Sequence, residues 1–255
     1  MSDKSANLSS GQTAGALRGR TAMVVGGSRG IGAAIVRRLS AAGATVAFTY
    51  HGSAEAADAL AASSEGVSAV KCDSADAAAL AETVEHVADR FGSIDILVYN
   101  AGVGLSGSVD QMNLADFDRT FAINVRGAFV ATKAASPRMG EGGRIIFIGS
   151  NVTQRAAFSG AAAYVMSKSA IAGLARGLSQ DFALRKITVN TVQPGPVDTD
   201  LNPADGPKSG PTLSLIPLGR FGETSEIASL VAYLAGPESS FITGAALTIN
   251  GGYSV

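Results

Sequence analysis

Short apolar runs recur along the chain, and longer stretches of helical periodicity separate them. The apolar runs are rich in β-branched side chains and cover residues 21–25, 45–50, 67–72, 94–99, 144–149, 187–192 and 246–249. A short apolar run bounded by glycine or polar residues is typical of a buried strand. We therefore predict about seven strands.

Helical periodicity lies between these runs, at residues 30–42, 53–64, 75–91, 114–138, 161–185 and 223–235. Gly43 and Gly92 follow two of these stretches, where glycine commonly ends a helix. Strands that alternate with helices predict an α/β fold with a doubly wound parallel sheet and helices on both faces. No linker or repeat interrupts the pattern, so residues 19–255 are predicted to form a single domain. Residues 1–18 are small and polar, and we interpret them as a flexible tail or a cloning remnant.

Composition and charge narrow the function classes. The chain has 255 residues, 46% of them hydrophobic, with 31 glycines and a formal net charge of −1. A charge so close to zero gives no bulk attraction to nucleic acid or acidic lipid. Cys72, His51 and His86 are the only cysteine and histidines, too few for a disulfide framework or a zinc site, and we predict no metal. The first residues lack the apolar core of a signal peptide, and no run is long enough to span a membrane. We expect a soluble cytoplasmic protein.

A glycine-rich turn links the first predicted strand to the first helix. Gly26, Gly30 and Gly32 surround Ser28, Arg29 and Ile31 in the sequence GGSRGIG. Glycines allow close approach of a ligand to the backbone, and a helix N-terminus suits a pyrophosphate. The spacing differs from the G-x-G-x-x-G fingerprint, and an ordinary tight turn is the alternative. We favour a dinucleotide site.

The end of the second predicted strand indicates which dinucleotide is bound. An acidic residue there commonly binds the adenosine ribose of NAD. This chain has Tyr50, His51 and Ser53, with no acid before Glu55. Arg29 in the glycine turn offers a guanidinium for a 2′-phosphate, and His51 and Ser53 can add donors. Alternatively Arg29 and His51 are solvated surface residues. We favour NADP(H) over NAD(H) as the cofactor.

Tyr164 and Lys168 lie four residues apart in the predicted helix 161–185, so they share one helix face. A nearby cation stabilises a phenolate and lowers the pKa of a tyrosine. A tyrosine with such a pKa can exchange a proton with a carbonyl or alcohol oxygen. This spacing alone is common on helix surfaces, so the catalytic interpretation of the pair depends on the other motifs in the sequence.

Four more motifs accompany this pair. They are Cys72-Asp73-Ser74 after the third strand, Asn100-Ala101-Gly102 after the fourth, Asn124 and Ser150, and Pro194-Gly195-Pro196-Val197-Asp198-Thr199 after the sixth. Together with the glycine turn, they resemble the short-chain dehydrogenase/reductase family from Leu17 to the C-terminus. The family's turn reads T-G-x-x-x-G-x-G, and Val25 stands here in place of the threonine. This difference puts one hydrogen bond of the loop in doubt.

The resemblance implies a Rossmann-like fold and a role for each motif. Asp73 would meet the adenine amino group beside Ser74, and Asn100, Ala101 and Gly102 would line the adenosine side. Pro194, Gly195, Val197 and Thr199 would lie at the nicotinamide carboxamide. Asn124, Ser150, Tyr164 and Lys168 would form a catalytic tetrad. In it Asn124 holds a water, Ser150 binds the substrate oxygen, Tyr164 donates the proton, and Lys168 binds the nicotinamide ribose and lowers the tyrosine pKa.

Each tetrad residue also has an ordinary structural role available. Asn124 could be a satisfied polar residue inside a helix, Ser150 a turn or cap residue, and Lys168 an exposed cation. Their predicted convergence at the carboxyl ends of parallel strands favours the catalytic interpretation. Residues 202–218 are rich in proline, glycine and small polar residues. They form either a substrate lid, with Leu213, Leu215 and Ile216 near the pocket, or a tolerant surface loop.

The resemblance implies an NADPH-dependent reductase of a ketone, aldehyde or 3-oxoacyl substrate. It also implies a homotetramer built through the long helices around Asn124 and Tyr164. Within the family, GGSRGIGAAIVRR, FTYHGS, CDSAD and QPGPVDTDLNPADGP resemble a bacterial subgroup that includes a cyclic-di-GMP-binding biofilm dispersal mediator. The 3-oxoacyl-carrier-protein reductases are more distant in these stretches. The alternative function is therefore a nucleotide-binding regulator with little or no turnover.

Overall fold

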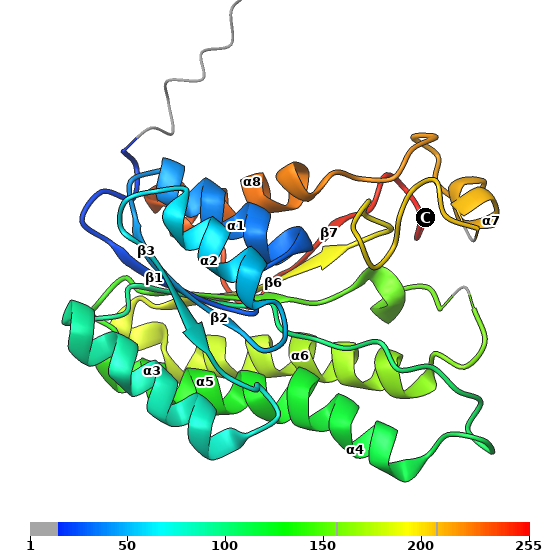
Figure 1. The fold of residues 1–255 in the computed structure, drawn as a ribbon, viewed down its shortest axis with the longest axis horizontal. Helices are drawn as coiled ribbons and strands as arrows, with labels where there is room; N and C mark the ends of the chain where they lie inside the picture. The colour runs from blue at the N-terminus through cyan, green and yellow to red at the C-terminus, as the bar shows by residue number, and fades with distance from the viewer. Residues whose placement is uncertain (1–14, 157, 208) are drawn as a thin grey trace, which may run out of the picture.

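The computed structural model describes residues 15–156, 158–207 and 209–255. Seven parallel strands form one sheet in the order β3-β2-β1-β4-β5-β6-β7 (Figure 1). The strands are β1 Thr21–Val25, β2 Thr45–Tyr50, β3 Val67–Lys71, β4 Ile96–Tyr99, β5 Arg144–Ile148, β6 Thr188–Pro194 and β7 Ala246–Ile249. The strand order reverses between β1 and β4, because β2 lies on one side of β1 and β4 on the other. In doubly wound sheets, ligands bind beside such a reversal, at the carboxyl ends of the strands.

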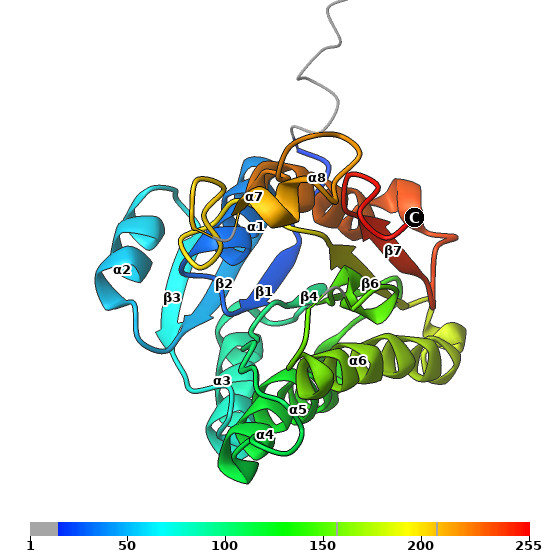
Figure 2. The ribbon, with the colours of Figure 1, turned by 90° about the vertical axis from the view of Figure 1, so that its right-hand side faces the viewer.

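Helices cover both faces of the sheet, as predicted. The α-helices are α1 Gly30–Ala41, α2 Ala54–Ala62, α3 Ala77–Phe91, α4 Leu114–Phe121, α5 Ala128–Ala135, α6 Ala162–Asp181, α7 Ser209–Leu213 and α8 Thr224–Ala235. Figures 1 and 2 show α1, α2 and α8 on one face and α3 to α6 on the other. The fold is the predicted single Rossmann-like layered domain.

The hydrophobic pattern of the sequence explains this arrangement. Every residue of β1, β4 and β5 is buried, because helices cover these strands on both sides. Asp76 caps α3 by accepting hydrogen bonds from the N–H groups of Ala78 and Ala79. Gly92 ends the same helix in the left-handed conformation, as its place in the sequence predicted.

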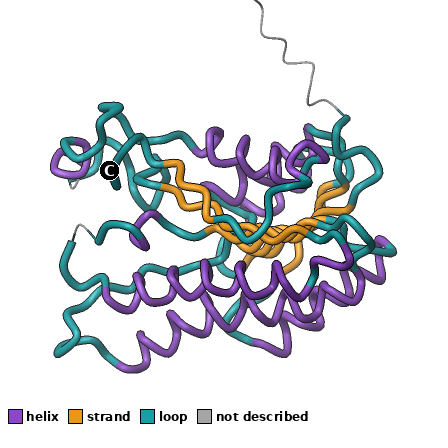
Figure 3. The backbone as a smooth tube through the Cα atoms, turned by 180° about the vertical axis from the view of Figure 1, so that it is seen from behind, coloured by secondary structure: helices purple, strands orange, loops and turns teal. Residues whose placement is uncertain are grey.

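The predicted helix 114–138 is not a regular α-helix. A π-helix, Ala122–Gly127, separates α4 from α5, and a short 3₁₀ turn, Ser136–Arg138, follows. The helix α6 ends at Asp181, four residues before the predicted end, and a 3₁₀ turn covers Ala183–Arg185. Pattern reasoning did not predict α7 (Figure 3).

The tail predicted for residues 1–18 falls mainly outside the described residues. Residues 15–19 form a turn, and Leu17 in it is 2% exposed. The N–H of Leu17 donates to the carbonyl of Ala42 after α1, so this residue packs against the domain. Among the described residues, the helices include none with the length and apolar character needed to cross a membrane.

Candidate active site

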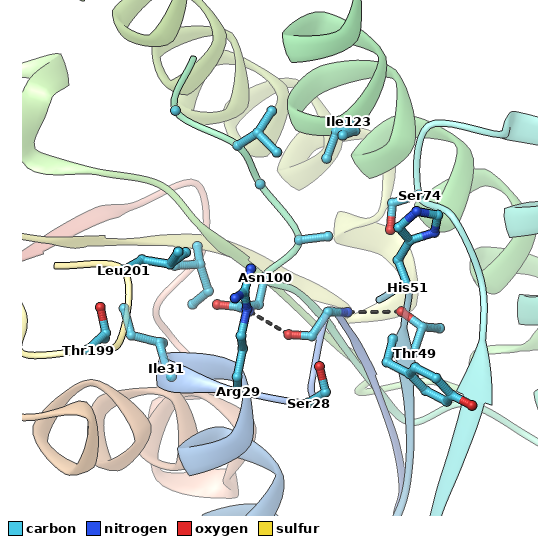
Figure 4. Close-up of a pocket in the computed structure, with 18 of the residues that line it drawn as sticks. Ser28, Arg29, Ile31, Thr49, His51, Ser74, Asn100, Ile123, Thr199 and Leu201 are labelled. Atoms are coloured by element: carbon cyan, nitrogen blue, oxygen red, sulfur yellow. Dashed lines mark hydrogen bonds between the residues drawn. The ribbon is translucent and has the colours of Figure 1, made fainter. Parts of the chain in front are cut away.

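A pocket of about 680 Å³ opens at the carboxyl ends of the strands, beside the reversal in strand order. The predicted site residues that line it are Gly26, Ser28, Arg29, Gly30, Ile31, Tyr50, His51, Ser53, Asp73, Ser74, Asn100, Ala101, Gly102, Ser150, Tyr164, Lys168, Pro194, Gly195 and Thr199. Figure 4 shows Thr199 and Leu201 on one side of Arg29, and His51 and Ser74 on the other. The pocket therefore joins segments that lie far apart in the sequence.

The glycine turn is shaped for close backbone contact. Gly26 has φ +82°, and a Cβ on it would lie 2.8 Å from the Ala101 backbone. Gly32 lies outside the lining, and a Cβ there would lie 2.1 Å from the Gly26 carbonyl oxygen, so it packs the helix start against the turn. Arg29 is the N-cap of α1 and makes no side-chain hydrogen bond to the helix N-terminus. This cradle fits a pyrophosphate, which would accept from the first N–H groups of α1.

A hydroxyl from the neighbouring strand supports the turn. The N–H of Gly26 donates to Thr49 Oγ1 at 2.9 Å, and Asn100 Nδ2 donates to the Gly26 carbonyl at 2.6 Å (Figure 4). Thr49 is 1% exposed. Because Val25 lacks a hydroxyl, one hydrogen bond of this loop was in doubt. Thr49 supplies a hydrogen bond to the loop, and its polarity within an apolar strand is the signal that could have revealed it.

The adenosine end of the pocket contains the predicted residues after β2. Tyr50, His51 and Ser53 line it, as does the exposed Arg29. Asp73 after β3 lies close to them, with 3.9 Å between its Oδ2 and His51 Nδ1. Its other oxygen accepts from the N–H of Ala75 at 3.0 Å, which fixes the carboxylate. The acid thus follows β3, and β2 ends without one.

Tyr164 and Lys168 lie on the first half of α6 and both reach the pocket. Lys168 Nζ donates to the Ile148 carbonyl at 2.9 Å and lies 5.8 Å from the centroid of the Tyr164 ring. Lys168 is 5% exposed, and burial lowers its pKa to about 8. It is therefore not the exposed cation of the alternative interpretation.

The expected lowering of the Tyr164 pKa is wrong for this structure. Burial raises the pKa of Tyr164, and a hydrogen bond with Ser150 offsets only part of this effect. Spacing on a helix predicted the neighbouring cation correctly, but it does not reveal how deeply the phenol is buried. The phenol is consequently protonated at neutral pH and can act as a donor.

Ser150 follows β5 and is 8% exposed. Its Oγ accepts a 3.3 Å hydrogen bond from the N–H of Val152 and caps the short 3₁₀ helix Asn151–Thr153. The capping role and the site role therefore coexist, because an accepting hydroxyl oxygen still has its proton to donate. Ser150 and Tyr164 present two hydroxyl groups to the same part of the pocket.

The Asn124 side chain lies behind the pocket wall and does not line it. It is 1% exposed; its Oδ1 accepts from the N–H of Val103, and its Nδ2 donates to the Val103 carbonyl, each at 2.9 Å. The same Nδ2 donates to Ser167 Oγ on α6 at 2.9 Å. A Cβ on Gly102 would lie 3.1 Å from Lys168 Nζ and 3.3 Å from Asn124 Oδ1. Asn124 thus joins the turn after β4 to the helix that carries Tyr164.

The end of β6 and the segment after it form part of the pocket wall, and Thr199 lies on the side away from His51 and Ser74 (Figure 4). Pro194, Gly195 and Thr199 line it, whereas Val197 is 5% exposed and pairs instead with Gly222 in an isolated bridge. A Cβ on Gly30 would lie 3.5 Å from the methyl group of Thr199, so Thr199 faces the glycine turn.

Sequence reasoning missed several lining residues. They are Thr49, Gly52, Cys72, Val103, Gly104, Arg119, Ile123, Ile148, Gly149, Asp200 and Leu201. Most of them adjoin predicted residues at strand ends, which is the signal that could have found them. Arg119 and Ile123 belong to α4 and the π-helix, and their approach depends on how that helix packs. Gly104 faces the Tyr164 ring, since a Cβ there would lie 3.8 Å from two ring carbons.

The proposed lid residues do not line the pocket. Ile216 is 4% exposed and packs with Phe221 and Tyr253 in a small cluster, with Leu215 against it. Leu213 is 38% exposed. Leu201, which is 73% exposed, is the apolar residue near this segment that reaches the pocket.

The C-terminal residues hold the segment that follows Ser150. Gln154 Nε2 donates to Thr248 Oγ1 at 2.8 Å, and Gln154 Oε1 accepts from Ser254 Oγ at 2.6 Å. Arg155 donates to the Tyr253 carbonyl at 2.9 Å, and its guanidinium lies 5.6 Å from the centroid of the Tyr253 ring. Residues 248, 253 and 254 therefore hold the segment that follows Ser150, although Gln154 and Arg155 do not line the pocket themselves.

Comparison with known proteins agrees with this geometry. The family model described as enoyl-(acyl carrier protein) reductase matches residues 25–254, nearly the whole chain. The chain belongs to the short-chain dehydrogenase/reductase family. This assignment confirms the resemblance drawn from the glycine turn, the Asn100-Ala101-Gly102 motif and the Tyr164–Lys168 pair, and it places the chain in an oxidoreductase family.

Several short-chain dehydrogenase/reductase relatives are similar over almost their full length. The cyclic-di-GMP-binding biofilm dispersal mediator protein of Escherichia coli K12 is 50% identical over 239 residues, 94% of this chain and 99% of that protein. A short-chain dehydrogenase/reductase structure from Serratia marcescens BCRC 10948 is 52% identical with TM-score 0.92, covering 94% and 99% of the two chains. A Burkholderia cenocepacia J2315 short-chain dehydrogenase structure in complex with NADP is 46% identical with TM-score 0.92, again over 94% and 99%.

Proposed function

We propose that this protein is an NADPH-dependent reductase of carbonyl compounds, with Tyr164 as the proton donor. The observation that carries the proposal is one pocket that holds the Ser150 hydroxyl, the Tyr164 phenol and the Lys168 ammonium at one end and a glycine cradle at the other. This combination matches a reaction in which a proton and a hydride are added to a C=O group.

The pocket residues fit the proposed cofactor. The Gly26–Gly32 turn and the N-terminus of α1 would hold the pyrophosphate, and Asp73 and Ser74 would lie at the adenine. Arg29, His51 and Ser53 would take the 2′-phosphate, because β2 ends without a carboxylate. A relative that is 46% identical has been crystallised with NADP, which supports this choice. When bound there, NADPH supplies the hydride for the carbonyl carbon.

The chain's own residues handle the proton and the oxygen. Burial raises the pKa of Tyr164, which keeps its proton available for a carbonyl oxygen that gains negative charge. The Ser150 hydroxyl donates to the same oxygen and offsets the developing charge. Lys168 would lie beside the nicotinamide ribose and place its positive charge near the Tyr164 ring. Asn124 fixes the turn after β4 against α6 and thereby holds both helix residues in place.

The substrate would be a ketone, an aldehyde or a 3-oxoacyl compound. It would enter beside Leu201 and Gly104, where the pocket wall has an exposed apolar side chain and a glycine that packs against the Tyr164 ring. The proposed catalytic end of the pocket contains polar and apolar groups. The polar groups belong to Ser150, Tyr164 and Lys168, and the apolar ones to Val103, Ile148 and Pro194.

We also propose a cytoplasmic homotetramer. Figure 2 shows α4, α5 and α6 on one face of the sheet, and each of these helices has an exposed apolar side chain: Leu114 is 76% exposed, Phe129 51% and Met166 54%. A second hollow of about 970 Å³ lies among these helices, lined in part by Phe121, Phe129 and Leu174. A second copy of the chain that packed on these helices would remove this apolar surface from water.

A nucleotide-binding regulator is the second candidate function. The 50% identical relative from Escherichia coli supports it, because that protein is named as a cyclic-di-GMP-binding biofilm dispersal mediator. A pure sensor has no need for the Ser150, Tyr164 and Lys168 arrangement, so we place this function second.

One experiment separates the two candidates. NADPH oxidation is followed with a panel of ketones, aldehydes and 3-oxoacyl thioesters, and cyclic-di-GMP binding is measured on the same protein by calorimetry. Turnover that disappears in Tyr164→Phe supports the reductase. Tight binding of the cyclic dinucleotide with no turnover of any panel member would replace it with the regulator.

A further inference from the structure

Tyr99 ends β4 directly before the Asn100-Ala101-Gly102 turn, but its side chain points away from the pocket into the protein. It is 3% exposed, and its hydroxyl donates a 2.6 Å hydrogen bond to the backbone carbonyl of Ile123. Burial raises the pKa of this phenol, which therefore remains a neutral donor. Neither the sequence pattern nor the proposed chemistry gave Tyr99 a role.

Gly127 provides the space that this hydroxyl occupies. A Cβ at Gly127 would lie 2.1 Å from the Tyr99 hydroxyl oxygen and 2.8 Å from the Ser74 carbonyl oxygen. Any side chain at position 127 would therefore compete with the phenol for the same volume. The pair Tyr99 and Gly127 thus joins the end of β4 to the helix that packs over it.

The contact coincides with the irregular part of that helix. In a regular α-helix the Ile123 carbonyl would accept from the N–H of residue 127. Here the phenol donates to that carbonyl, and Ala122–Gly127 is a π-helix. A side chain inserted into the hydrogen-bond ladder is a known cause of such irregularities, and π-turns occur often at functional sites. Asn124 is the residue immediately after Ile123, inside this turn.

The same phenol also contacts Ser74, a residue that lines the adenosine end of the pocket. Its oxygen interacts with the Ser74 hydroxyl, which lowers the phenol pKa in part. Ser74 and Ile123 both line the pocket and are drawn in Figure 4. One buried hydroxyl therefore contacts two wall segments, Ser74 and the π-helix that contains Ile123 and Asn124.

We propose that Tyr99 is a positioning residue whose hydroxyl holds the π-helix so that Asn124 meets Val103 and Ser167, and ties this helix to Ser74 at the cofactor pocket. The kinetic consequence rests on the proposed reductase function. The consequences for helix dynamics and for cofactor binding do not depend on that function. Removal of the hydroxyl alone therefore tests the assignment in two independent ways.

The first test uses Tyr99→Phe, which keeps the ring, and Thr132→Val as the matched control. Thr132 Oγ1 donates to the Ala128 carbonyl in the same helical segment and is also buried, but it has no contact with the pocket. Hydrogen exchange followed by mass spectrometry should show about tenfold faster exchange in residues 122–128 for Tyr99→Phe and not for the control. NADPH should bind several-fold more weakly only in Tyr99→Phe. Unchanged exchange and affinity would overturn the proposal.

The second test is a double-mutant cycle with Asn124→Ala on the rate of carbonyl reduction. A hydroxyl that acts through Asn124 should matter only while Asn124 is present. Tyr99→Phe should lower kcat about tenfold in the wild-type background and less than twofold in Asn124→Ala, with KM for the carbonyl substrate little changed. An equal loss in both backgrounds would show general destabilisation and refute the positioning role. Absence of turnover in the wild type would refute the proposed function, while exchange and NADPH affinity would still decide the role of Tyr99.

A third measurement approaches the contact from the other side. Gly127→Ala should lower the melting temperature, because the added methyl group meets the Tyr99 hydroxyl. The loss should be smaller in the Tyr99→Phe background, where the 2.1 Å contact with the hydroxyl is gone and the Ser74 carbonyl at 2.8 Å and the ring Cζ at 3.2 Å remain. An equal loss in both backgrounds would show that the two residues do not share this space.

Discussion

The hydrogen bond from Gly26 to Thr49 gives a prediction about cofactor affinity. Thr49→Val keeps the shape of the side chain and removes only the hydroxyl that accepts from the Gly26 N–H at 2.9 Å. The turn would then have one unpaired donor next to the bound pyrophosphate. Thr45→Val is the matched control, since it makes the same exchange at the other end of β2, outside the pocket.

The magnitude follows from where the unpaired donor lies. A buried donor without a partner costs about 1–3 kcal/mol. Gly26 lines the pocket and is only partly buried, so water can reach it and the lower end of this range applies. A cost of about 1 kcal/mol corresponds to roughly fivefold in affinity. We therefore expect Thr49→Val to raise the Kd for NADPH about fivefold and to affect NADH by a similar factor, because the pyrophosphate is common to both.

The assay is titration of cofactor fluorescence with wild type, Thr49→Val and Thr45→Val, together with melting curves without cofactor. The reasoning fails if Thr49→Val binds NADPH as tightly as wild type. It also fails if Thr45→Val weakens binding by the same factor, since the effect would then belong to β2 as a whole.

Further predictions concern the catalytic groups and the cofactor choice. Tyr164→Phe should abolish reduction while NADPH still binds in fluorescence titrations, and Ser150→Ala should lower kcat about a hundredfold in the same assay. Because the pKa of Lys168 is about 8, its cation is lost as pH rises through that value, so kcat/KM measured against pH should fall above it. Between about pH 8 and the ordinary lysine pKa, Lys168 binds a proton in the unfolded chain but not in the folded protein. Its contribution to the free energy of unfolding, measured by chemical denaturation, should therefore become more stabilising as pH rises through this range. NADPH should be preferred over NADH at least about tenfold in steady-state kinetics, with Arg29→Ala weakening mainly NADPH and His51→Asp shifting preference toward NADH.

Most of the fold could be predicted because each strand is a short apolar run with clear ends. The bounds of β1, β2 and β7 agree with the predicted runs 21–25, 45–50 and 246–249. The π-helix at Ala122–Gly127 could not be predicted, because it coincides with a contact between Tyr99 on β4 and a backbone carbonyl 24 residues later in the chain. Helical periodicity contains no information about such a contact.

The site was predictable where its residues follow strand ends and form motifs. Residues that reach the pocket from the interior of an element, such as Thr49 on β2 and Ile123 on the π-helix, were missed because their direction depends on packing. The sign of the Tyr164 pKa shift was wrong for a related reason. Spacing shows that Lys168 is near, but only the packed structure shows that burial dominates.

The bracing of the Ser150 segment by the end of the chain affects how the protein should be handled. Ser254 and Tyr253 bind Gln154 and Arg155, and the terminal Val255 is 99% exposed. An affinity tag fused after Val255 would be accessible, but it would be attached next to the residues that hold the segment after Ser150. A rate measured on such a fusion would reflect any movement of the segment after Ser150 as well as the reaction itself. A tag placed at the other terminus, or removed by a protease before kinetics, avoids this confusion.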